Sequence, residues 1–224
     1  MGSLRLPVAV GLVVLGLAGA AFPQGAAAPA TYIDCTVDVI QVKLAEGGSG
    51  GVTEREILDF GATLEEKLKG LSSRGEPRVL ARFHSGLTEE NPAVLEALRK
   101  VFVVTPVSFE DKEYRRFSMQ EIGSTVTLSG VQAGGSGEYA VTLDAQASSV
   151  IGWMKDGNPV ILSTSITGTR LMQAGSSKVF TTLLVADEKE LGRDPLRDFE
   201  SQGHTESSSA PVTYQFVIVV TLRR

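Results

Sequence analysis

The arrangement that comes nearest to a catalytic site is His84 beside Ser85, because a histidine base and a serine nucleophile are the reactive pair of Ser-His-Asp hydrolases. These residues follow 78–83, a stretch typical of a strand, and successive side chains of a strand point to opposite faces. Gly48-Ser49-Gly50 and Gly135-Ser136-Gly137 lack the strand-turn-helix context of a nucleophile elbow. We therefore predict no catalytic residue, and we interpret His84 as a strand-end histidine with a local hydrogen bond.

Two pairs of adjacent carboxylates, Glu65–Glu66 and Glu89–Glu90, are candidates for acid–base chemistry. The first pair falls on the solvent side of a predicted helix and the second in a loop, so nothing drives the two pKa values of a pair apart. The run Gly134-Gly135-Ser136-Gly137 has the composition of a phosphate cradle, but a strand rather than a helix follows it. We interpret the carboxylates as solvated charges and the glycine run as a hairpin turn.

Composition argues against metal, cofactor and nucleic-acid binding. Cys35 is the single cysteine and there are two histidines, far fewer ligands than most metal sites need. The formal net charge is −5, whereas nucleic-acid binding requires a basic face. With 42% hydrophobic and 21% charged residues, the chain is globular. We predict no cofactor, no metal and no nucleic-acid partner, and a buried free thiol at Cys35.

The N-terminus has the pattern of an export signal. Arg5 precedes an apolar stretch over 6–21, and two small-x-small sites follow, Ala18-Gly19-Ala20 and Ala26-Ala27-Ala28. A permanent membrane anchor is the alternative, although the apolar stretch is short for a span. The sequence predicts a signal peptide over 1–28 and an exported domain over 29–224, with cleavage near Phe22 or Pro29.

The first half of the exported domain predicts both strand and helix. Apolar and polar residues alternate over 31–44, as in a half-buried strand. Thr53 and Glu56 have the spacing of a capping box, and apolar residues at helical spacing predict one amphipathic helix over about 54–72. Residues 89–100 are ambiguous, since Asn91-Pro92 has the form of a helix start, and 101–107 predicts a strand.

From 117 onward the period is almost entirely two, which predicts successive antiparallel strands. The apolar run over 214–222 predicts a strand covered on both faces, and the polar segment 187–210 predicts a mobile loop. The fold class is α+β, mainly β, with the amphipathic helix packed on an antiparallel sheet. The expected strands are 122–131, 139–145, 160–172, 178–186 and 214–222.

This order of elements resembles the C-terminal domain of the bacterial secretins, the outer-membrane ring proteins of type II and type III secretion and of type IV pili. The resemblance covers about 31–224, and departures from the family pattern stand at Phe83-His84, Thr182-Leu183-Leu184 and Thr221-Leu222. The family's N-terminal periplasmic ring domains are also missing, so we expect a stand-alone secretin-like protein. The segments that carry it are TYIDCTVDVIQVKL, RGEPRVLARF, EIGSTVTL, the hairpin at 134–137 with YAVTLDAQASSV, NPVILSTSITGTRLMQAGSS and FVIVVTLRR.

The resemblance implies a non-enzymatic envelope protein of the periplasm or outer membrane, a homo-oligomeric ring component for protein secretion. It also implies secretion or envelope components as partners and a possible contact with the outer membrane. Trp153 would then be an aromatic residue of a membrane girdle, or else a core or subunit-contact residue. The alternative is a soluble periplasmic domain of secretin-like fold that binds another envelope component without forming a pore.

Overall fold

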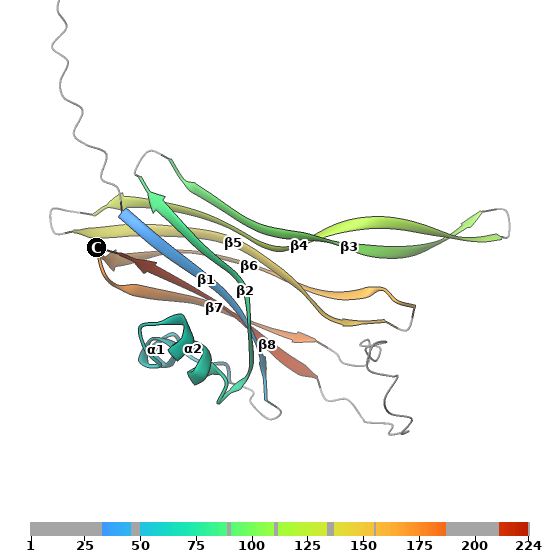
Figure 1. Cartoon of the computed structure of the whole chain (residues 1–224), viewed down its shortest axis with the longest axis horizontal. Coiled ribbons are helices and arrows are strands. Elements are labelled where there is room, and N and C mark those ends of the chain that lie inside the picture. The colour runs from blue at the N-terminus through green and yellow to red at the C-terminus, as the bar shows by residue number, and fades with distance from the viewer. Residues whose placement is uncertain are drawn as a thin grey trace, which may run out of the picture. The chain divides into compact units, whose positions relative to one another are not determined.

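Two four-stranded antiparallel sheets make up most of the structure (Figure 1). The structure is a computed structural model, and it describes residues 33–45, 50–88, 91–109, 112–133, 137–154, 156–186 and 211–223. The predicted signal peptide over 1–28 and the predicted loop over 187–210 lie outside these residues. None of the helices that are described is long and apolar enough to cross a membrane.

The first sheet has the strand order β2-β1-β8-β7, and the second has the order β3-β4-β5-β6. The first sheet consists of β1 (Ile33–Leu44), β2 (Gly75–Leu87), β7 (Ser177–Ala186) and β8 (Val212–Leu222). The second consists of β3 (Ala93–Phe109), β4 (Lys112–Gln132), β5 (Glu138–Trp153) and β6 (Pro159–Gln173).

The main core lies between the two sheets and follows from the period-two pattern of the strands. Every second residue of β1 and β8, such as Val37 and Ile218, joins residues of the second sheet, such as Val141 and Leu143. The other face of the first sheet forms a second core with the helices, in which Val217 packs near Ile57. Strand β8 is therefore buried on both faces, which confirms the prediction for 214–222.

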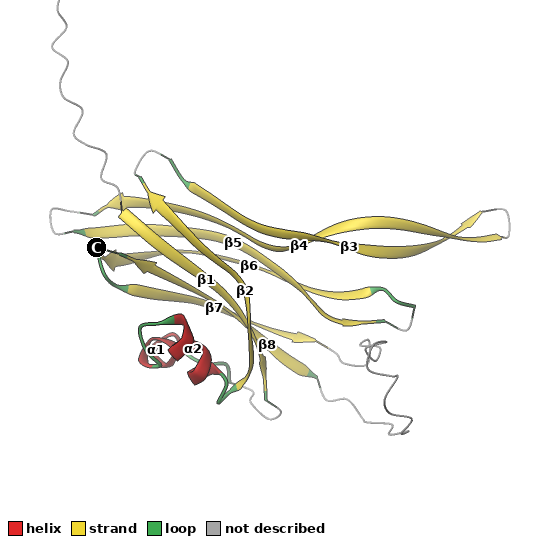
Figure 2. Cartoon of the chain, viewed as in Figure 1, coloured by secondary structure: helices red, strands yellow, loops and turns green. Residues whose placement is uncertain are grey.

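Two short helices stand where one long helix was predicted, so the expectation of a continuous helix over 54–72 is wrong (Figure 2). Helix α1 spans Glu54–Asp59 and helix α2 spans Leu64–Leu71. Gly61, with φ of 137°, interrupts the helical backbone conformation between α1 and α2. Thr63 and Glu66 then form a second capping box, which starts a new helix.

Residues 93–100 form the beginning of β3, so the possible helix start at Asn91-Pro92 is wrong. The reason is long-range pairing: Leu95 lies opposite Val126 of β4 and packs against the main core. A strand partner more than twenty residues away overrides a helix signal that is purely local. The predicted strands over 101–107, 122–131 and 160–172 are confirmed within longer strands.

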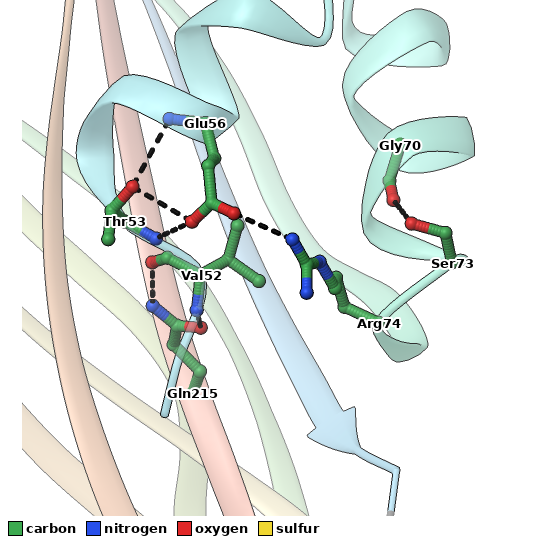
Figure 3. Close-up of polar contacts among 7 residues, drawn as sticks. All are labelled: Val52, Thr53, Glu56, Gly70, Ser73, Arg74 and Gln215. Atoms are coloured by element: carbon green, nitrogen blue, oxygen red, sulfur yellow. Dashed lines mark hydrogen bonds and ion pairs between the residues drawn. The ribbon is translucent and has the colours of Figure 1, made fainter. Parts of the chain in front are cut away.

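The predicted capping box at Thr53 is confirmed, and Figure 3 shows its contacts. The Thr53 hydroxyl accepts from the Glu56 amide at 3.3 Å, and a Glu56 carboxylate oxygen accepts from the Thr53 amide at 2.9 Å. We expect Thr53→Ala to lower the free energy of unfolding by about 1 kcal/mol, measured by chemical denaturation. Thr63→Ala provides the matched variant for α2; an unchanged midpoint in both would contradict the role of the caps.

Candidate interaction surface

The side chains of His84 and Ser85 point to opposite faces of β2, so they cannot act together as a base and a nucleophile. His84 Nδ1 lies 3.3 Å from the Thr36 hydroxyl, and the Ser85 hydroxyl faces the carbonyl oxygen of Gly86 at 3.4 Å. His84 thus lies within β2 rather than at the end of a strand, and its hydrogen bond crosses to β1, 48 residues earlier, rather than staying local. No nucleophile–base pair is formed by these two residues.

The carboxylate pairs have structural positions where they are described. Glu66 caps α2, and its hydrogen bonds to Thr63 lower the pKa of its carboxyl group. Glu65 lies exposed beside it, whereas Glu89–Glu90 and residues 134–136 lie outside the described residues. Within the described ranges, no group of three or more His, Cys, Asp or Glu residues is placed to hold a metal ion.

Cys35 is a buried thiol in β1, as predicted. Its side chain belongs to the main core, and burial raises its pKa to about 11. The thiolate is the reactive form of cysteine, and burial disfavours that form here.

Charged and polar groups gather where α2 faces the first sheet. Asp38 of β1 is 5% exposed and lies 3.2 Å from Arg82 Nε, while Lys67 Nζ donates to the carbonyl oxygens of Gly61 and Ala62. Burial raises the pKa of Asp38 and lowers that of Lys67. Because the folded state binds a proton at Asp38 more tightly than the unfolded chain, this residue favours folding less as pH rises through the acidic range. The Asp38–Arg82 pair links β1 to β2, and Lys67 ties α2 to the linker that precedes it.

The second sheet carries a groove of about 540 Å³ on the face away from the main core. Hydroxyl and amide side chains line most of it, including Thr125, Gln146 and Ser163. Glu121 at its rim is 3.7 Å from Lys100 in an exposed ion pair. These groups can donate and accept hydrogen bonds, but none of them forms a nucleophile–base pair.

The β3–β4 hairpin continues beyond the rest of the second sheet as a two-stranded ribbon, which we call the ribbon (residues 98–109 and 112–123). β4 pairs with β5 only from Ser124 onward, whereas β3 and β4 stay paired out to Phe109 and Lys112. Figure 1 shows the ribbon projecting past the β5–β6 hairpin.

One face of the ribbon exposes large apolar side chains. Phe102 lies opposite Met119, and Phe117 lies two residues further along β4 on the same face. Their exposed fractions are 62%, 61% and 67%. This cluster of exposed apolar side chains makes the ribbon a candidate contact surface.

Two side chains hold the ribbon to the β5–β6 hairpin. At the base, the Ser148 hydroxyl accepts from the Gly123 amide at 3.0 Å. Further out, the Asn158 side chain accepts from the Val104 amide at 2.6 Å and donates to the Val104 carbonyl at 2.7 Å. Sequence reasoning missed both contacts, because each joins residues that belong to different turns and strands.

The second sheet ends on two strands, β3 and β6, each of which has a partner in the sheet on one side only. Both backbone groups of Val104 point away from β4, toward Asn158. Backbone groups alternate in direction along a strand, so Leu98, Lys100 and Phe102 also direct theirs toward the free side. Trp153 lies half-buried at the end of β5.

No family model and no curated protein matches the sequence. Among solved structures, the chain is similar to the secretin-domain β-barrel of InvG from Salmonella, with 14% identity, a TM-score of 0.36, and coverage of 86% of this chain and 60% of that one.

Two other similar structures are also secretins. The type II secretin GspD of E. coli has 10% identity and a TM-score of 0.33, over 86% of this chain and 47% of that one. The competence-pilus secretin PilQ of V. cholerae has 12% identity and a TM-score of 0.34, over 88% and 61%. The chain thus spans about half to three fifths of the length of these proteins, which are of the family that its sequence pattern resembles.

Proposed function

We propose that this chain is a non-enzymatic, secretin-like protein of the cell envelope, which pairs strand edges between copies of itself to form a ring in the outer membrane for protein secretion. The observation that carries the proposal is that the second sheet ends on two long strands, β3 and β6, with 17 and 15 residues. Free edges of this length are templates for pairing with another chain.

The two free edges are different surfaces, which determines the kind of assembly. Pairing β3 of one copy with β6 of the next is a head-to-tail contact, and such contacts generate a ring when the rotation closes. The exposed apolar face of the ribbon, with Phe102 and Phe117, supports the proposal, because an assembly would remove it from water. The apolar stretch over 6–21 supports export.

The test uses one backbone hydrogen-bond donor on the β3 edge. Lys100→Pro removes an N–H that points to the free side and leaves the β3–β4 ladder intact, whereas Lys100→Ala removes the same side chain and keeps the N–H. We expect the wild type and Lys100→Ala to be extracted by detergent as an SDS-resistant multimer, and Lys100→Pro to be a monomer with unchanged circular dichroism. Images of the particle would show a ring.

A wild type that is monomeric on a sizing column and free of detergent-dependent extraction would contradict the proposal. That result would favour a soluble periplasmic domain that binds another envelope component without a pore. Equal multimer yields for Lys100→Pro and Lys100→Ala would place the contact between copies elsewhere than on the β3 edge.

A further inference from the structure

We propose that Asn158 is an edge clamp: its side-chain amide occupies the free edge of β3 at Val104, in the place that a strand of a second copy would take, and so limits pairing between copies to the part of β3 before Val104. The inference rests on the proposed function, since it concerns how the β3 edge is regulated.

The first step is geometric. A neighbouring strand in an antiparallel sheet offers one acceptor and one donor to each outward-facing residue. Asn158 Oδ1 and Nδ2 offer the same pair to Val104, at 2.6 Å from its nitrogen and 2.7 Å from its carbonyl oxygen. A carboxamide has the same donor and acceptor groups as a peptide, so it substitutes for a strand residue at this point.

The amide is held in the orientation that this role requires. Asn158 Nδ2 also donates to Asp156 Oδ2 at 2.8 Å, and the Asn158 backbone amide donates to Asp156 Oδ1 at 3.0 Å. A flipped amide would direct its nitrogen at the Val104 N–H and lose both acceptors. The Asn158 side chain is 6% exposed, so its polar groups depend on these partners rather than on water.

Release of the clamp has a cost, which keeps this part of the edge closed. A strand from a second copy would give Val104 two backbone hydrogen bonds in exchange for two side-chain ones, but the buried Asn158 amide would lose both of its Val104 partners. Pro106 is the next residue whose backbone faces the free edge, and proline has no backbone N–H to donate. The β3 edge is therefore divided into an open segment from Val94 to Phe102 and a closed segment that begins at Val104.

The test combines hydrogen exchange with assembly. In Asn158→Ala, exchange of the Val104 amide should rise roughly tenfold or more, because it loses its acceptor. Multimers should form several-fold faster than in the wild type, because the edge is open from the start. Asp156→Ala should give intermediate values, since it removes only the group that orients Asn158.

Thr142→Val is the matched control, because it removes a side-chain hydrogen bond to Thr169 at 2.9 Å without touching the β3 edge. Unchanged Val104 exchange in Asn158→Ala would overturn the clamp, and faster exchange with a wild-type rate of assembly would overturn its regulatory role. If neither protein forms multimers, the proposed function fails, and the exchange of the Val104 amide alone decides whether Asn158 closes the edge.

Discussion

Replacing Phe216 by alanine should remove a large part of the stability of this protein. The Phe216 side chain is fully buried in the main core, on a strand with neighbours on both sides. Truncation leaves a cavity between two sheets that cannot easily collapse, and we expect a loss of about 3–5 kcal/mol in the free energy of unfolding. That is a large part of the stability of an ordinary domain.

The matched control is the same substitution at Phe117. Its side chain is 67% exposed on the ribbon, so Phe117→Ala should change the free energy of unfolding by less than about 0.5 kcal/mol. Chemical denaturation followed by circular dichroism measures both. Similar midpoints for the two variants would show that β8 is not the central, doubly covered strand that the structure describes.

The second large effect is expected at Gly123, where the ribbon leaves the sheet. Its φ is 140°, and a Cβ atom there would clash with the carbonyl oxygen of Ala97 on the paired strand. Both the backbone conformation and the close approach exclude a side chain unless the two strands move apart. We expect Gly123→Ala to destabilise the protein by roughly 2–4 kcal/mol.

Gly50→Ala controls for the loss of a glycine as such. A Cβ atom at Gly50 would meet nothing within 4 Å, so this variant should unfold at the wild-type midpoint. Thermal unfolding distinguishes the two glycines, and equal midpoints would contradict the close packing of β3 on β4. Exchange of the ribbon amides in Gly123→Ala would show where the strands separate.

The parts of the fold that the sequence predicts are those with local causes. The Thr53–Glu56 capping box requires only a spacing of three residues, and the burial of β8 follows from the unbroken apolar run around Phe216. The break between α1 and α2 also has a local cause, Gly61 followed by Thr63. The sequence-based prediction missed this break because apolar residues continue at helical spacing through Leu64 and Leu68.

The surface that carries the proposals could not be predicted from local signals. Whether a strand lies at the edge of a sheet depends on partners far along the chain. The alternation of apolar and polar residues in β3 would be the same at the edge of the sheet and in its centre. The Asn158–Val104 contact joins residues 54 positions apart. An asparagine beside Asp156 and Gly157 is explained by the turn that these residues form. Its contact with Val104 is therefore visible only in the three-dimensional structure.

The position of β8 between β1 and β7 constrains the order of events when the chain is made. Gln215 of β8 also holds the loop before α1, with bonds of 2.8 and 2.7 Å to the backbone of Val52, 163 residues earlier. A polypeptide that emerges N-terminus first therefore cannot complete its first sheet or dock its helices until β8 has emerged. Closing so long a loop is slow, and the apolar faces of β1 stay unprotected meanwhile. Unfolded chains of this protein should thus depend on chaperones that hold the earlier segments until β8 is available.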